Sequence, residues 1–159
     1  MTEASYRLIR AGDEEELHSL VMSAFVEFVA RDLPEGGREH FNEYASPARL
    51  GAPERRQETV VAVSEGRSVG VGRVGRRYEV PHIDLLFVEK EMHGQGVGRE
   101  IVKRLLEVAR GNDPAAERLT VNATRYAVPS YARVGFAASG EERVMAGIIS
   151  TPMEIALGD

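Results

Sequence analysis

HIDLLFVEKEMHGQGVGREIVKRLLEVA, which spans residues 82–109, is the stretch that decides the fold. Its first part, His82–Val88, is almost continuously apolar, as in a strand that is covered on both faces. Apolar residues then recur at steps of three and four, which predicts an amphipathic helix that begins near Val97. A glycine-rich turn at 94–98 joins the two. The stretch therefore predicts a buried strand that leads through a tight turn into a helix.

The segments on either side continue the mixture of strands and helices. Strands are predicted at 6–10, 59–64, 68–76 and 119–123, with one or two more in 136–157. Helices are predicted at 13–31, at 38–50 with an interruption near Pro47, and at 127–134. The turn Glu65-Gly66-Arg67 joins two strands as a hairpin, because glycine adopts positive φ easily. Pro81 is expected to end the second of them. This order predicts a mixed α/β (α+β) fold, with one central sheet between helices, in one domain over residues 1–159.

Composition excludes several classes of protein and site. The chain has 20 Lys and Arg against 25 Asp and Glu, so its formal charge of −5 does not suit nucleic-acid binding. Without cysteine it cannot form disulfides, thiolate nucleophiles or cysteine-based metal sites, and we expect no metal. No apolar run approaches the ~18 residues that cross a bilayer, and the N-terminal residues do not resemble a secretory signal. We therefore expect a cytoplasmic protein that binds neither nucleic acid nor membrane.

Residues 70–75, GVGRVG, match the GxGxxG pattern of dinucleotide-binding loops letter by letter. That fingerprint requires a helix to begin at the glycines. The chain here reaches Pro81 too soon for a helix that crosses back to the sheet. We therefore interpret the segment as a strand whose small residues lie where another element packs closely.

The second glycine cluster, His93–Gly98, stands where an anion could bind. It follows a buried strand and opens a helix, whose first N–H groups and dipole favour a negative charge. Glycines let the backbone approach a phosphate without Cβ clashes. It is not a Walker A loop, since no Lys-Ser or Lys-Thr follows, and Arg99 stands where GxGxxG needs its last glycine. From these residues alone, a phosphate cradle and a merely tight turn both remain open.

The surroundings of this cluster resemble motif A of the GNAT N-acetyltransferases. Leu86-Phe87-Val88 is followed by five residues, then by Gly-Gln-Gly-Val-Gly and a helix, with His93 where the family has Arg or Gln. Farther on, VNATRYAVPSYARVGF at 121–136 resembles motif B, in which Tyr131 leads the counterpart of a YEKLGF-like helix. The chain is thus similar to the GNAT family, which implies a mixed, mostly antiparallel sheet flanked by helices.

The resemblance implies an acetyl-CoA-dependent N-acetyltransferase that transfers an acetyl group to a primary amine of a small molecule or protein, by direct attack on the thioester. Acetyl-CoA is the implied co-substrate. In the family, the strand backbone pairs with pantetheine and the loop wraps the pyrophosphate. This assigns cofactor binding to Leu86, Phe87, Val88, His93, Gly94, Gln95, Gly96, Val97, Gly98 and Arg99. Arg133 is assigned to the phosphates and Asn122 to pantetheine, with a solvated arginine and a sheet-edge amide as alternatives.

Two side chains are candidates for proton transfer. Tyr131 matches the family's general acid, which protonates the departing sulfur, although a tyrosine on a helix is also an ordinary packing residue. An amine with a pKa of about 10 is mostly protonated at neutral pH, so a base or a water path is useful. His82 falls where some family members carry a glutamate base, and Asp84 shares its face of the strand. The base is therefore His82, Asp84 or water, while a histidine that only caps the strand is the alternative for His82.

Other functions and the identity of the acceptor stay open on the sequence. A non-catalytic acyl-CoA-binding or sensing module on the same fold is the main alternative, and an interaction protein without a CoA site is another. Residues 31–58 are expected to line the acceptor side, and the negative net charge favours a cationic acceptor. A homodimer is implied by the family alone.

Overall fold

The computed structural model describes residues 3–29, 37–145 and 148–158. In this part of the chain, eight strands form one sheet in the order β1-β2-β3-β4-β5-β8-β6, and β7 pairs with β8. The strands are β1 (Ser5–Leu8), β2 (Thr59–Ser64), β3 (Arg67–Arg77), β4 (Val80–Val88), β5 (Arg118–Thr124), β6 (Ala137–Ala138), β7 (Arg143–Met145) and β8 (Ile148–Ala156). The helices are α1 (Glu14–Phe28), α2 (Gly37–Tyr44), α3 (Pro47–Leu50), α4 (Val97–Asn112) and α5 (Val128–Val134), with 3₁₀ turns at η2 (Pro53–Arg55) and η3 (Lys90–Met92).

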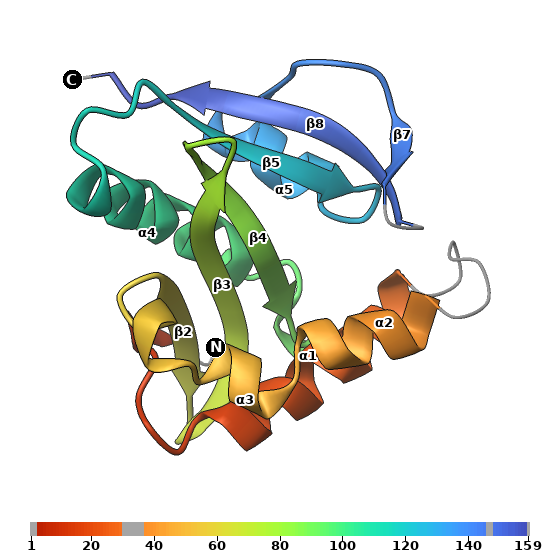
Figure 1. The fold of residues 1–159 in the computed structure, drawn as a ribbon. Helices are drawn as coiled ribbons and strands as arrows, with labels where there is room; N and C mark the ends of the chain where they lie inside the picture. The colour runs from red at the N-terminus through yellow and green to blue at the C-terminus, as the bar shows by residue number, and fades with distance from the viewer. Residues whose placement is uncertain (1–2, 30–36, 146–147, 159) are drawn as a thin grey trace.

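Helices cover both faces of this sheet (Figure 1). On one face, which we call the α1 face, the core includes Leu17 of α1, Phe41 of α2 and Leu50 of α3. On the other, the α4 face, the core includes Ile101 of α4 and Tyr131 of α5. Neighbouring strands pair antiparallel, except for β4 and β5, which run parallel. The mixed, mostly antiparallel sheet flanked by helices is confirmed.

The glycines of β3 make room for the elements that pack on it. A Cβ at Gly72 would lie 2.5 Å from Ile101 Cγ2, and one at Gly70 would lie 2.9 Å from Ile101 Cδ1. Both glycines therefore let α4 approach the strand closely. A Cβ at Gly75 would lie 2.7 Å from charged atoms of Arg55 and Asp84. The interpretation of GVGRVG as a strand with close packing is confirmed.

Several element boundaries differ from the prediction. The second hairpin strand does not end at Pro81, because the turn falls at Tyr78 and Glu79, which have positive φ of 51° and 63°. Pro81 lies near the start of β4, where a strand tolerates a missing N–H. The C-terminal region forms three strands where one or two are predicted, and residues 30 and 31 of the predicted 13–31 helix lie outside the described residues. None of the described helices is long and apolar enough to cross a membrane.

β4 carries one extra residue relative to β3. The register between the two strands shifts between Ile83 and Leu85, so Asp84 is left without a partner, which is a β-bulge. The bulge changes the side-chain alternation, since Ile83 belongs to the core of the α4 face and Leu85 to that of the α1 face. β4 and β5 pair only at His82 and Ile83 within the described strands. From Asp84 to Val88, the edge of β4 toward β5 therefore has no described strand partner.

Candidate active site

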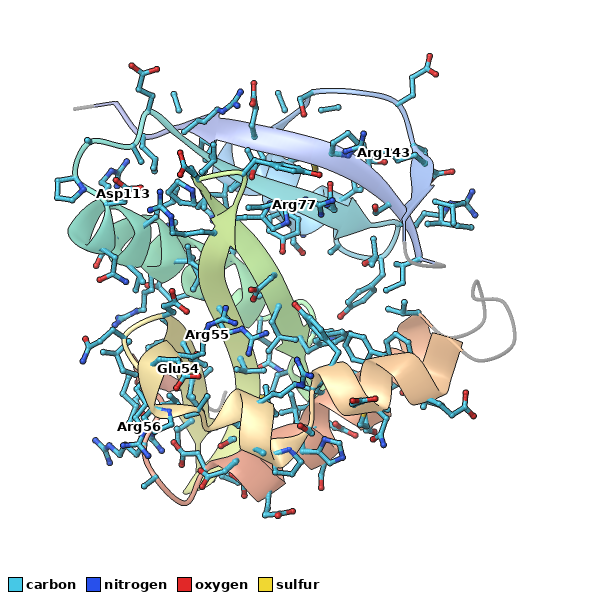
Figure 2. The ribbon with its side chains drawn as sticks, viewed as in Figure 1. Glu54, Arg55, Arg56, Arg77, Asp113 and Arg143 are labelled. Carbon is cyan, nitrogen blue, oxygen red and sulfur yellow. The ribbon has the colours of Figure 1, made fainter. Side chains whose placement is uncertain are left out.

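A cavity of about 470 Å³ lies where β4 and β5 part. Its lining comes from both faces of the sheet, with Ile83 and Tyr131 from the α4-face core and Phe41 and Phe87 from the α1-face core. Arg77, at the end of β3, also borders it (Figure 2). The cavity thus passes through the sheet, and two molecules that enter from opposite faces could meet in it.

Tyr131 presents its ring to this cavity from α5. It is 2% exposed and packs edge-on against Phe136, with the ring centroids 5.3 Å apart. No side chain or backbone group in the described ranges forms a hydrogen bond with its hydroxyl. Burial, and to a smaller extent the charge of Asp84, raises the pKa of Tyr131. The hydroxyl therefore stays protonated at neutral pH and is available as a proton donor.

His82 borders the same cavity and is held by β5. Its Nδ1 lies 2.8 Å from Thr120 Oγ1, and the Thr120 hydroxyl donates to the Pro81 carbonyl at 3.3 Å. When that hydroxyl gives its proton to the Pro81 carbonyl, Nδ1–H donates to Thr120 and the lone pair lies on Nε2. Burial, followed by the charge of Arg77, lowers the pKa of His82, while Asp84 raises it. The imidazole is therefore neutral at pH 7, with one nitrogen able to accept a proton.

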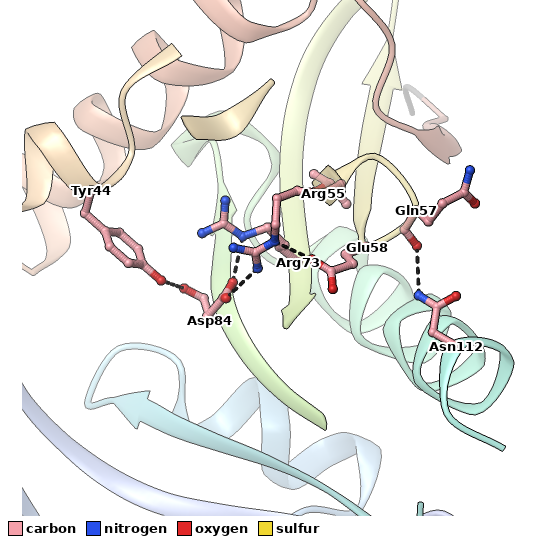
Figure 3. Close-up of polar contacts among 8 residues, drawn as sticks. Tyr44, Arg55, Gln57, Glu58, Arg73, Asp84 and Asn112 are labelled. Atoms are coloured by element: carbon pink, nitrogen blue, oxygen red, sulfur yellow. Dashed lines mark hydrogen bonds and ion pairs between the residues drawn. The ribbon is translucent and has the colours of Figure 1, made fainter. Parts of the chain in front are cut away.

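Asp84, the residue of the bulge, is held by two arginines (Figure 3). Arg73 Nε donates to its Oδ1 at 2.8 Å, and Arg55 Nη2 donates to its Oδ2 at 2.7 Å. The Tyr44 hydroxyl donates to the Asp84 carbonyl at 3.1 Å, and Glu58 holds Arg55 from the other side. Both carboxylate oxygens are thus engaged, so the geometry favours His82 over Asp84 as the base.

Two glycines of the loop before α4 have left-handed backbone and open space around them. Gly94 and Gly96 have φ of +79° and +82°, and a Cβ on either would contact nothing within 4 Å. Val97, the first residue of α4, is buried. A Cβ at Gly98 would lie 3.6 Å from Val88 Cγ2, which is an ordinary van der Waals contact. The positive φ values explain the glycines, and the space outside them is open.

The polar side chains around this loop are mostly exposed. Gln95 Nε2 donates to the Glu91 carbonyl at 3.0 Å. Arg99 and Arg133 are exposed, and neither forms an ion pair or hydrogen bond with any described residue. Both arginines are therefore accessible to an anion in solution.

His93 contacts the last residue of β4. Its Nε2 lies 2.8 Å from the Val88 carbonyl oxygen and also contacts the Tyr126 hydroxyl, and the two rings are 5.3 Å apart. The imidazole is thus turned back onto the strand and onto the segment between β5 and α5. Leu86 and Phe87 line the cavity ahead of it.

Asn122 also borders the cavity, but from the α1 face. It alternates along β5 with Val121, which belongs to the α4-face core, and shares its face with Thr120. Of the predicted residues, the cavity lining thus contains His82, Leu86, Phe87, Asn122 and Tyr131, with Asn122 on the face opposite Tyr131. Val88, residues 93–99 and Arg133 lie outside that lining.

Sequence reasoning missed the residues that support these candidates. Arg73 gave a signal, since it is the one charged residue in the apolar run 68–75. Thr120 gave none, because its contact with His82 depends on the pairing of β4 with β5. Tyr126 gave no sequence signal either, because its contact with His93 joins two loops that are distant in the sequence.

Solved structures with the same fold are numerous among known proteins. A GCN5-related N-acetyltransferase from Rhodopseudomonas palustris is 23% identical, with a TM-score of 0.75 over 98% of this chain and 97% of that chain. PaiA N-acetyltransferase from Thermoplasma acidophilum, in complex with coenzyme A, is 15% identical, with a TM-score of 0.78 over 97% and 99%. YncA from Salmonella typhimurium, with its cofactor acetyl-CoA, is 16% identical, with a TM-score of 0.69 over 99% and 95%.

Comparison with curated proteins finds no match. The family model of the acetyltransferase (GNAT) domain, however, matches residues 29–157, which include every residue of the site described above. The chain belongs to the GNAT acetyltransferase family.

Proposed function

We propose that this protein is an acetyl-CoA-dependent N-acetyltransferase that acetylates a primary amine. The observation that carries the proposal is the cavity that passes through the sheet, with a protonated Tyr131 hydroxyl and a neutral His82 imidazole in its walls. Family membership and the structural relatives that hold CoA or acetyl-CoA support it.

The residues present fit the co-substrate. The open space at Gly94 and Gly96, in front of the N-terminus of α4, suits a pyrophosphate bound by backbone N–H groups. The edge of β4 from Leu86 to Val88 offers backbone groups to pantetheine, as an added strand would use them. Exposed Arg99 and Arg133 are accessible to the remaining phosphate charge.

The side chains then supply the two proton transfers of the reaction. Acetyl-CoA, when bound, supplies a thioester whose C–S bond breaks as the amine forms an N–C bond with the acetyl carbon. The amine must lose a proton, and His82 Nε2 accepts it. The departing sulfur must gain a proton, and the Tyr131 hydroxyl donates it.

A non-catalytic acyl-CoA-binding module is the alternative on this fold. Tyr131 favours the enzyme, because a pure binder has no use for a tyrosine hydroxyl at the cavity that has no described hydrogen-bond partner. Release of free thiol from acetyl-CoA in the presence of amines separates the two.

A homodimer stays a prediction from the family resemblance, and a cytoplasmic location stays a prediction from the composition.

The loop assignment predicts the effect of Gly96→Glu. The glutamate should weaken CoA binding more than about tenfold (~1.4 kcal/mol), because its charge would enter the space meant for the phosphates. Gly66→Glu is the matched control, since Gly66 has φ of +78° and open space around its Cβ but lies in the β2–β3 turn. Calorimetric titration with CoA measures both. Equal affinity losses in the two variants, or no loss in either, would refute the assignment.

Tyr131→Phe tests the proton donor. The phenyl ring keeps the packing against Phe136, so folding and CoA affinity should change little. Because the hydroxyl acts mainly in the transition state, kcat should fall by roughly 10²-fold or more. Steady-state kinetics and calorimetry on the same preparation measure the two effects. Full kcat would assign the proton to another group, and loss of CoA binding would make Tyr131 a cofactor contact.

His82→Gln tests the proton acceptor. Burial and Arg77 lower the pKa of His82, so the acidic limb that this residue contributes to the pH profile of kcat/KM should lie below pH 6.5 in the wild type. The variant should lose that limb, and its rate should fall more at pH 7 than at pH 9, where more of the amine is already neutral. Kinetics across this pH range measure both effects. An equal loss at every pH would indicate a positioning role instead.

A further inference from the structure

The charged groups in the described lining of the cavity are already committed to other partners. Arg76 pairs with Asp113, with 2.6 Å between Nη1 and Oδ2. The Arg77 guanidinium carbon lies 5.5 Å from the ring centre of Tyr78. Asp84 accepts hydrogen bonds from two arginines, so its charge is compensated. Apart from its amine, an acceptor in this cavity therefore meets mostly neutral groups.

Ser150 is a neutral polar residue of this lining. It is 3% exposed, and its hydroxyl forms no hydrogen bond with any described residue. It lies opposite Thr124 in the pairing of β8 with β5, and Thr124 alternates with Ala123 of the α4-face core, which places Ser150 on the α1 face. Ile148, two residues before it, packs on the α1-face core, in agreement. A hydroxyl that is buried in this way costs free energy until a ligand bonds to it.

The position of Ser150 relative to His82 sets the length of an acceptor that contacts both. His82 pairs with Thr120 of β5, and Ser150 pairs with Thr124, four residues farther along the same strand. Four residues of strand span about 13 Å. A hydrogen bond at each end occupies about 3 Å, which leaves about 7 Å for the acceptor itself. This length is that of about six bonds, as in two residues of extended backbone.

Apolar side chains make up much of the lining on the α1 face. Phe41 stacks on Phe25 with their ring centroids 3.9 Å apart, and it meets Phe87 edge-on at 5.7 Å. Phe41, Phe87 and Ile148 all border the cavity. An aliphatic chain in the cavity would gain free energy by leaving water for these surfaces. The lining therefore suits an acceptor that is apolar along its middle and polar at its far end.

We propose that the acceptor is an extended primary amine whose far end carries a neutral hydrogen-bonding group, of which a hydroxyl is the simplest, and that Ser150 binds this group. The proposal rests on the acetyltransferase function and names the substrate class of the same site. An N–C bond forms at the amine, the thioester C–S bond breaks, the amine proton goes to His82, and the sulfur takes a proton from Tyr131. The chain between the two polar ends packs on Phe41 and Phe87.

Acceptors that differ only at the far end test this proposal. Thiol release from acetyl-CoA is measured with 5-aminopentanol, hexylamine and cadaverine, which carry a hydroxyl, a methyl and an ammonium group at the same distance from the reacting amine. We expect kcat/KM for 5-aminopentanol to exceed that for hexylamine by at least about fivefold, because the methyl group leaves the Ser150 hydroxyl buried without a partner. It should also exceed that for cadaverine, since a second charge is costly to bury beside neutral groups.

A serine variant and a matched control locate the effect. Ser150→Ala should remove the advantage of 5-aminopentanol and keep turnover of hexylamine, which also shows that the variant folds. Ser64→Ala should keep the advantage, because Ser64 is as deeply buried, at 4% exposed, but bonds to the Glu3 carbonyl outside the cavity lining. The hydroxyl of ethanolamine is too close to its amine to reach Ser150. The kcat/KM ratio of ethanolamine to propylamine should therefore be the same in the wild type and in Ser150→Ala.

The outcomes separate the two proposals. Hexylamine or cadaverine used as well as 5-aminopentanol, or thiol release only with amines outside this set, would overturn the acceptor class while acetyl transfer stands. An advantage of 5-aminopentanol that survives in Ser150→Ala would overturn the role of that serine. No thiol release with any primary amine, in a protein that binds CoA by calorimetry, would overturn the acetyltransferase function and the acceptor with it.

Discussion

The ion pairs of Asp84 with Arg55 and Arg73 are the contacts on which the rest of the site depends. They hold the one residue of β4 that has no partner on β3, and Gly75 keeps the space that they occupy. Arg73 is 2% exposed, so its charge must be paired to be buried at all. With the bulge fixed in this way, β4 turns away from β5, and the sheet opens at its centre.

The opening separates two groups whose surroundings shift their pKa values in opposite senses. Tyr131 lies in the apolar core of the α4 face, where burial raises its pKa and keeps the proton on oxygen. For His82, burial and Arg77 lower the pKa and keep the imidazole neutral. One group thus holds a proton to give and the other has a lone pair to receive one, which is the division of roles that the proposed transfer uses. The sheet places them on the walls of one cavity.

The parts of this structure that the sequence predicts are local. The strand, glycine turn and helix around Gly96 depend on neighbours a few residues away, as does the hairpin turn at Gly66, and all are confirmed. The bulge at Asp84 could not be predicted, since it is a mismatch of register between two strands and leaves no pattern in either one. The contacts of His82 with Thr120 and of His93 with Tyr126 depend on β5 lying beside β4, which only the assembled sheet determines. Tyr131 was predicted from the family resemblance, because the apolar pattern of its helix alone indicates a packing residue.

Amide hydrogen exchange with and without CoA tests most directly whether the opened edge of β4 and the loop after it form the CoA site. We expect CoA to slow exchange at 86–88 and 94–98, because those N–H groups would bond to the pantetheine and the phosphates. β1 and β2 lie at one end of the strand order, away from the parting of β4 and β5. The exchange rates of their amides should be unchanged and serve as the internal reference. Slowed exchange elsewhere, with 86–88 and 94–98 unaffected, would contradict a CoA site at this opening.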